Sequence, residues 1–192
     1  MEYMKNIEEK IGESFLAITY TKGNAVPTLP EIVEDYAVVT EAQASIALAT
    51  TEEAPVFFAV KGHLIGACPV TLEKATSLYI KEKMHASIVS YNLDPKTIEV
   101  YVGPCLTFSH QIVDRPLIEK MMALGYRAAC KRTDGVDFFD IPVMILLQLR
   151  ELGVPMKNIH ISDYDTYENP EILYSKLRQD GEKKNVTVAT LL

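Results

Sequence analysis

The hydrophobic pattern of this chain changes character once, after Pro69, and this change limits the folds open to it. Before that point the apolar segments are short, rich in β-branched or aromatic residues and separated by turn formers, which predicts strands. The expected strands are residues 15–20, 36–40, 45–50, 56–60 and 63–68. Only Lys61 and Gly62 separate the last two, a spacing typical of a tight hairpin in which glycine takes a positive φ. The first third of the chain is therefore expected to be β-structure.

After Pro69 the apolar residues follow a helical period, and strands and helices then alternate. Thr71, Asp114 and Asp140 are expected N-caps of three helices, and Gly125 and Gly153 are expected to end the last two. The expected elements are a helix from 71 to about 84, a strand at 98–102, helices at 115–125 and 141–152, a strand at 158–162, a short helix from Asn169 and a closing strand at 186–191. This order predicts an α+β fold of mixed β-sheet layers with flanking helices, in one domain spanning residues 1–192.

Composition narrows the possible partners of the chain. Its 19 Lys and Arg and 26 Asp and Glu give a formal charge of −7, spread along the sequence, so we expect no nucleic-acid partner. The apolar stretch 141–149 is too short to span a bilayer, and the N-terminus is charged, so we expect no membrane association and a cytoplasmic location. The three cysteines lie far apart and predict neither a disulfide framework nor a metal knuckle. Oligomeric state stays open.

Reactive side chains are densest at residues 103–110, where a predicted strand ends. Cys105 and His110 would form a nucleophile and base pair if the loop folds back, because a thiolate needs a nearby imidazolium. The alternative, which we favour, is that Cys105 is a buried core thiol and His110 a turn or surface residue. A group that orients the base is not identifiable from the sequence.

Acidic residues in two places, the pair Glu52 and Glu53 and the single Asp165, are further candidates for acid and base chemistry. Glu52 and Glu53 are adjacent, so in extended chain only one of them enters a given pocket, although most such pairs are solvated. Asp165 lies in an acidic and aromatic run after a predicted strand and either lines a pocket or caps an ordinary loop. His63, His85 and His160 have no partner at metal-ligand spacing and are expected to be structural.

Residues from Asp35 onward resemble the laccase-domain family, whose members are described as polyphenol oxidases and as zinc-dependent purine-nucleoside enzymes. The segment EVYVGPC at 99–105 is similar to the family's strand and GPC turn, and SHQIV at 109–113 stands at its C-(C/H)-Y-E-V segment. FFDI at 138–141 and QLRELGV at 148–154 resemble a family helix, and Thr166 matches the Thr of a C-T pair. Leu173-Tyr174-Ser175, followed by Arg178 and by Asp180-Gly181, resembles the family segment F-Y-S-Y-R-R-D-G. The resemblance implies the laccase-domain fold.

The same resemblance implies that the family's metal ligands are replaced here. The family binds zinc or copper through a His of Q-V-H-G, a Cys of A-D-C-V-P-V and a His of V-H-A-G-W, and these positions correspond to Lys22, Glu53 and Pro69. A protonated Lys, one carboxylate and a Pro are not a zinc donor set. We therefore expect no metal cofactor, and we expect Lys22 and Glu53 to form a charge pair in the vacated space. Asp165 replaces the Cys of the C-T pair.

Three functions follow, in order of preference. The first is a metal-free protein with a pocket for a nucleoside-like or aromatic molecule, with Lys22, Thr166 and Arg178 as candidate substrate-binding residues. The second is an active purine nucleoside phosphorylase, deaminase or polyphenol oxidase of the same family, with Glu53 or Asp165 as the acid or base and Cys68 or His110 recruited as metal ligands. The third is a thiol hydrolase that uses Cys105 and His110. The candidate catalytic residues over all three hypotheses are Glu53, Cys105, His110 and Asp165.

Overall fold

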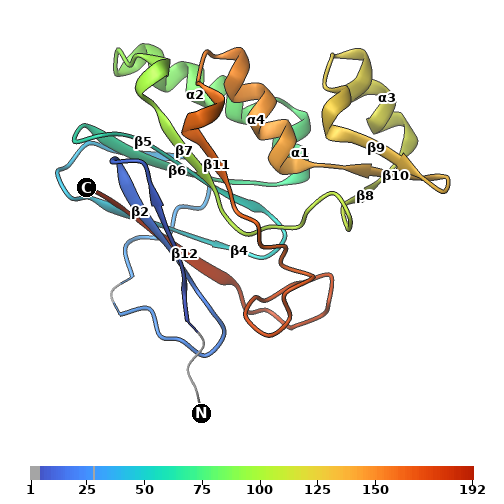
Figure 1. Cartoon of the computed structure of the whole chain (residues 1–192), viewed down its shortest axis with the longest axis horizontal. Coiled ribbons are helices and arrows are strands. Elements are labelled where there is room, and N and C mark those ends of the chain that lie inside the picture. Colours follow the sequence, from blue (N-terminus) through green and yellow to red (C-terminus); the bar gives the residue numbers. More distant parts are fainter. Residues whose placement is uncertain (1–4, 28) are drawn as a thin grey trace.

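A computed structural model describes residues 5–27 and 29–192, and in these ranges the chain forms layered sheets with helices on one side (Figure 1). The helices are α1 (Leu72–Thr76), α2 (Tyr79–Ser90), α3 (Arg115–Ala123) and α4 (Ile141–Glu151). The strands are β1 (Ile7–Ile11), β2 (Phe15–Tyr20), β3 (Ala37–Val39), β4 (Ser45–Thr50), β5 (Ala54–Val60), β6 (Leu64–Val70), β7 (Glu99–Val102), β8 (Ile112–Val113), β9 (Cys130–Thr133), β10 (Val136–Phe139), β11 (Ile159–Ile161) and β12 (Asn185–Leu191). The α+β prediction is confirmed.

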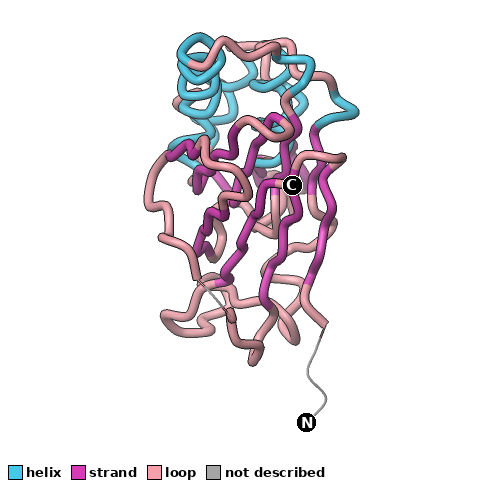
Figure 2. Tube along the Cα trace, turned by 90° about the vertical axis from the view of Figure 1, so that its left-hand side faces the viewer, coloured by secondary structure: helices cyan, strands magenta, loops and turns pink. Residues whose placement is uncertain are grey.

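A five-stranded sheet, in the order β11-β7-β5-β6-β3, is the middle layer of the molecule. Helices α1, α2 and α4 cover one of its faces, and a four-stranded antiparallel sheet, β1-β2-β12-β4, packs on the other (Figure 2). A small third sheet, β8-β10-β9, carries α3 at one end of the structure. The only parallel pair within the named strands of the described ranges is β7 with β11.

Strand β5 shows why the middle sheet is buried on both faces. Successive side chains of a strand point to opposite faces, so Val56 and Phe58 enter the core under the helices, whereas Phe57 and Ala59 enter the core between the sheets. All four are fully buried. A continuous apolar sequence is what a strand with two covered faces requires.

The predicted caps and turns are present. The side chains of Thr71, Asp114 and Asp140 accept hydrogen bonds from backbone N–H groups in the first turns of α1, α3 and α4. Gly62, at the turn between β5 and β6, has the expected positive φ of 63°. Local side-chain chemistry therefore decided these element boundaries.

Two helix predictions were wrong. The helix after Thr71 is divided into α1 and α2, because Leu78 adopts a left-handed conformation with φ 64°. The break is satisfied by Gln148 of α4, which accepts a hydrogen bond from Lys81 N–H and donates one to the Ala75 carbonyl. The helix expected from Asn169 is absent. The Leu173 N–H donates a hydrogen bond to the Asn169 carbonyl and closes a single turn, and the Leu173 carbonyl then accepts a hydrogen bond from the Arg178 side chain.

Sequence reasoning also missed several strands. Strand β1 carries charged residues on its outer side and pairs along its whole length with β2. Strands β8, β9 and β10 are short.

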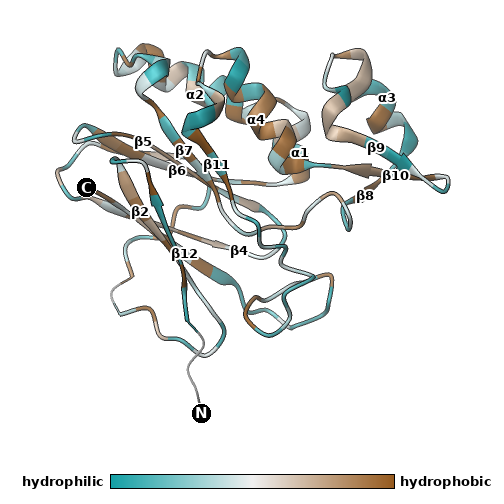
Figure 3. Ribbon diagram, viewed as in Figure 1, coloured by the Kyte–Doolittle hydropathy of each residue, from teal (hydrophilic) through white to brown (hydrophobic). Residues whose placement is uncertain are grey.

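Figure 3 shows α4 as largely hydrophobic, in agreement with its burial between the sheet and the neighbouring helices. Across residues 5–27 and 29–192, no helix combines the length and apolar character that a membrane span requires.

Candidate functional site

A cavity of about 880 Å³ opens at the edge of the sheets where several strands end. Strands β2 and β4 flank β12 and are both antiparallel to it, so their carboxyl ends lie at the same edge. The chain leaving β4 supplies Glu52 and Glu53, and the chain leaving β6 supplies Thr71 and Leu72. The remaining lining residues are Leu106, Ser109, His110, Gln111, Ile112, Ile141, Tyr167, Lys176, Leu177 and Gln179. Five segments distant in sequence thus meet at one cavity.

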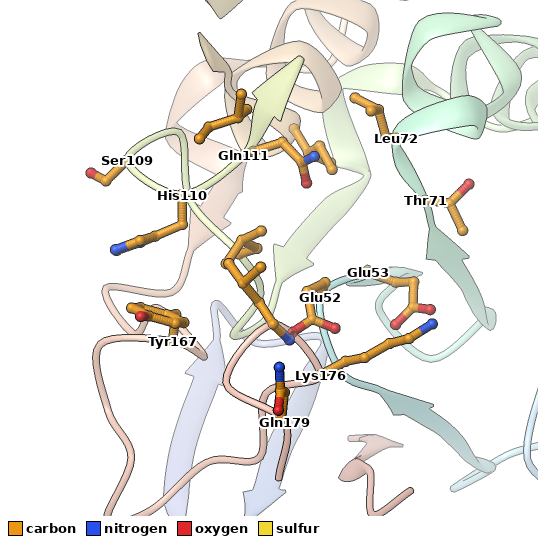
Figure 4. A pocket seen from close by; sticks show the side chains of 14 residues that line it. Glu52, Glu53, Thr71, Leu72, Ser109, His110, Gln111, Tyr167, Lys176 and Gln179 are labelled. Carbon is orange, nitrogen blue, oxygen red and sulfur yellow. Dashed lines mark hydrogen bonds between the residues drawn. The ribbon is translucent and has the colours of Figure 1, made fainter. Parts of the chain in front are cut away.

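The two glutamates lie on the same side of the cavity, and Lys176 extends toward them (Figure 4). Glu52 Oε1 accepts hydrogen bonds from the Ser175 hydroxyl at 2.8 Å and the Leu177 N–H at 2.9 Å. Glu53 Oε2 accepts bonds from the Thr51 N–H at 2.9 Å and hydroxyl at 3.2 Å. Burial raises the pKa of the Glu53 carboxyl, but the hydrogen bonds from Thr51 and from the N–H of Glu53 itself, together with the charge of Lys184, outweigh it, so this pKa lies below its usual range. Glu53 is therefore ionised at neutral pH.

His110 and Tyr167 lie at the other side of the cavity, with ring centroids 4.4 Å apart. The Nδ1 atom of His110 is 3.5 Å from Asp165 Oδ2 and 3.9 Å from Glu168 Oε1. This nitrogen is buried and makes no hydrogen bond in the described structure. The ring therefore lies between the tilted Tyr167 ring, at an interplanar angle of 38°, and the Asp165 carboxylate.

Asp165 is almost fully buried and joins two loops. It accepts hydrogen bonds from Thr107 N–H at 2.7 Å, from the Thr107 hydroxyl at 2.6 Å, and from the N–H groups of Tyr167 and Glu168. Burial raises the pKa of this carboxyl, but the hydrogen bonds from Thr107, Glu168 and Tyr167 lower it by more, so the pKa lies below its usual range. An acceptor that is ionised at neutral pH fixes the loops that carry His110 and Tyr167.

The predicted Cys105 and His110 pair is not brought together as a nucleophile and base. Cys105 is 2% exposed and does not line the main cavity. Burial raises the pKa of its thiol strongly, and the carboxylates of Asp140 and Asp165 raise it further. A thiol of this kind is a poor nucleophile at neutral pH, so the geometry agrees with a core role and disfavours a thiol hydrolase.

Alkylation of the cysteines tests this reading. In the native protein at pH 7.5, we expect iodoacetamide to modify the partly exposed Cys130 first, and Cys105 only after denaturation. Peptide mass spectrometry of native and urea-treated samples measures this order, with a Cys130→Ser variant as the control. Fast modification of Cys105 in the native variant would restore the hydrolase hypothesis.

Lys22 and Glu53 do not form the predicted charge pair. Lys22 Nζ instead contacts Asp180 Oδ2 at 3.0 Å, donates to the Pro170 carbonyl at 2.7 Å, and lies over the Tyr174 ring. The pairing expectation was wrong because it placed Lys22 beside β4, whereas the chain of residues 170–180 lies closer to it and supplies both an anion and a carbonyl.

The other two predicted substrate-binding residues also serve the C-terminal loop. Arg178 donates to the carbonyls of Thr166, Tyr167 and Leu173 and pairs with Asp180 at 2.6 Å. Thr166 is fully buried, and neither residue lines the cavity. Arg178 therefore organises the loop whose neighbours Tyr167, Lys176 and Gln179 face the cavity, a role that no local sequence signal indicated.

Comparison with known proteins gives the family. The family model described as "Multi-copper polyphenol oxidoreductase laccase" matches residues 12–189. The chain belongs to this family. A purine nucleoside phosphorylase of Staphylococcus epidermidis is 25% identical over 134 residues, which are 67% of this chain and 48% of the relative. The chain thus spans about half the length of this curated relative.

Solved structures share the fold. The hypothetical protein YfiH of Bacillus licheniformis superimposes with a TM-score of 0.73 at 18% identity, covering 82% of this chain and 61% of that one. YlmD of Geobacillus stearothermophilus gives a TM-score of 0.71 at 18% identity, with 82% and 60% covered. At this identity the likeness supports the fold alone, and the chain again matches less than two thirds of each neighbour.

The three residues that the sequence resemblance aligned with metal ligands, Lys22, Glu53 and Pro69, do not form a donor set for zinc or copper. Lys22 is engaged with Asp180, Pro69 has no side-chain donor atom, and Glu53 is a single carboxylate. Among residues 5–27 and 29–192, no three His, Cys, Asp or Glu side chains come close enough to hold one ion.

Proposed function

We propose that this chain is a metal-free member of the family that binds a small nucleoside-like or aromatic molecule in the cavity beside Glu52 and Glu53. The observation that carries the proposal is the composition of the cavity, which joins an aliphatic wall to a few polar groups. The aliphatic residues are Leu72, Leu106, Ile112, Ile141 and Leu177. Small-molecule sites have this character, with volumes of about 300–1,000 Å³.

The arrangement suits a flat, partly apolar molecule with polar edges. The aliphatic wall and the Tyr167 ring provide contacts for a heterocycle, while carboxylate, amide and hydroxyl groups face its polar atoms. The absence of a donor set at the positions of Lys22, Glu53 and Pro69 supports binding without a metal ion. Similarity to a purine nucleoside phosphorylase makes nucleosides the first molecules to test.

Calorimetric titration with adenosine and inosine tests the proposal. Ile112 lines the cavity but is 62% exposed, so Ile112→Trp should fill the opening without disturbing the core. We expect this variant to bind adenosine at least about tenfold more weakly, since a bulky ring competes for the same space. Val136→Trp, on the neighbouring strand β10 and outside the cavity, is the control and should bind like the wild type.

Two results would contradict the proposal. One is the absence of any binding heat with adenosine and inosine, and the other is zinc or copper at one equivalent in purified protein, measured by plasma mass spectrometry. The second candidate function is enzymatic turnover of nucleosides, which the similarity to the curated relative and the ionised Glu53 favour. The mixtures of protein with adenosine or inosine distinguish turnover from binding alone. Formation of free base or deaminated product on chromatography would establish an enzyme.

A further inference from the structure

Among the charged side chains that line the cavity, carboxylates outnumber cations. Glu52, Glu53, Lys176 and the imidazole of His110 are the ionisable groups of the lining other than the Tyr167 phenol. Two carboxylates against one ammonium give the cavity a negative character at neutral pH.

From this lining we propose that the cavity selects uncharged or cationic ligands through Glu52 and Glu53 and rejects ligands that carry phosphate, as well as free inorganic phosphate. This inference rests on the proposed function and specifies its ligand class. Each glutamate would accept hydrogen bonds from donors of the ligand, such as an amino group or a pair of sugar hydroxyls.

The hydrogen bonds of the two glutamates leave acceptor capacity for a ligand. Both bonds from Ser175 and Leu177 go to Oε1 of Glu52, and both bonds from Thr51 go to Oε2 of Glu53. In each residue the other oxygen accepts no hydrogen bond from another residue of the described chain. An ionised carboxylate has about four acceptor positions, so each retains room for a ligand donor. These bonds also hold the side chains in place before a ligand arrives.

Two of the nearby cations that would otherwise bind a phosphate are committed to protein groups, and a third, Lys184, lies outside the cavity lining and acts on Glu53. Lys22 is paired with Asp180 and bonded to the Pro170 carbonyl, and Arg178 is paired with Asp180 and bonded to three carbonyls. Phosphate sites in proteins use Arg forks, Lys or helix N-termini. In the described lining only Lys176 remains, and it extends toward the two carboxylates (Figure 4). A phosphate in the cavity would face two like charges.

An acidic cavity does not suit the reaction for which the curated relative is named. A phosphorylase takes inorganic phosphate as a co-substrate, and that anion needs a positively charged site beside the nucleoside. The cavity of this chain offers an acidic wall in that place. We therefore expect inorganic phosphate neither to bind in the cavity nor to change the affinity for adenosine.

Calorimetry with adenosine, AMP and inorganic phosphate tests the inference on the full chain. We expect adenosine to bind at least about tenfold more tightly than AMP at low ionic strength. The preference should shrink in about 1 M salt, because screening weakens repulsion between charges but leaves steric exclusion unchanged. Phosphate alone should produce no binding heat.

Charge-neutral variants identify the residues responsible. Glu52→Gln and Glu53→Gln keep a side-chain oxygen to accept the bonds from Ser175, Leu177 and Thr51, so the local structure should persist. In the double variant the ratio of AMP to adenosine dissociation constants should fall to within about threefold of unity. Glu41→Gln, an exposed carboxylate outside the cavity, is the matched control and should keep the wild-type ratio.

AMP binding as tight as adenosine in the wild type, or a gain in adenosine affinity on adding phosphate, would overturn the inference and leave the proposed function standing. An unchanged ratio in the folded double variant would equally overturn the role of the glutamates. Failure of adenosine, AMP and inosine to bind at all would overturn the proposed function and the inference together, and thermal unfolding curves would show that the samples were folded.

Discussion

Replacing Asp165 with alanine is expected to lower the free energy of unfolding by about 3–5 kcal/mol, the range for removing one partner from a buried, charged hydrogen-bond network. The carboxylate is 3% exposed and accepts bonds from Thr107, Tyr167 and Glu168. Its removal leaves three backbone N–H groups without their acceptor. Urea unfolding at pH 7 measures the loss, and Asp163→Asn, an exposed neighbour, is the control with an expected change below about 0.5 kcal/mol.

The pH dependence of this effect has a definite sign. The folded pKa of Asp165 lies below its ordinary value of 3.8, so the unfolded chain binds more protons in the acid range. The stability that Asp165 contributes is therefore fully present above about pH 5 and is lost as the pH falls through the folded pKa. Wild type and Asp165→Ala should converge in stability at low pH. Equal stability of the two proteins at pH 7, or a difference that grows on acidification, would contradict the assigned network.

Local sequence patterns predicted the framework of the fold. Capping residues such as Thr71 and Asp140 act on backbone groups within three positions, and the turn at Gly62 depends on a single positive φ, so a short window contains the cause. The two-faced burial of β5 is likewise written in its uninterrupted apolar sequence. The resemblance singled out Glu53 from the segment around it, and this residue lines the cavity.

The rest of the site depends on contacts that no window contains. Residues 169–177 remain irregular because side chains outside a helix ladder satisfy backbone groups of this segment: Arg178 donates to the Leu173 carbonyl, and Asn185 bonds to the N–H and carbonyl of Tyr174. Lys22 meets Asp180 across a sequence separation of 158 residues. Consequently, the part of the cavity that Lys176 and Gln179 provide could not be anticipated, and the predicted partner of Lys22 was wrong.

Gly66 is a further position where the constraint lies on a neighbouring strand. It pairs with Phe58 across the β5–β6 ladder, and a Cβ atom at Gly66 would lie 2.2 Å from Cζ of the Phe58 ring. The ring is fully buried and stacks on Tyr36, whose hydroxyl hydrogen-bonds to Ser87 of α2. The ring therefore lies over the glycine and connects the sheet to a helix.

Gly66→Ala is expected to destabilise the protein by about 2–3 kcal/mol, because the methyl group would require the buried ring to move within a packed core. A double-mutant cycle with Phe58→Leu separates this clash from other effects, since the smaller side chain makes room for the methyl group. The double variant should be more stable than the sum of the single effects by at least about 1 kcal/mol in urea unfolding. Additive effects would mean that the ring does not lie over Gly66. Strand β6, which carries Gly66, leads directly into Thr71 and Leu72 of the cavity wall. Displacement of β6 should therefore also weaken adenosine binding in Gly66→Ala and restore it in the double variant.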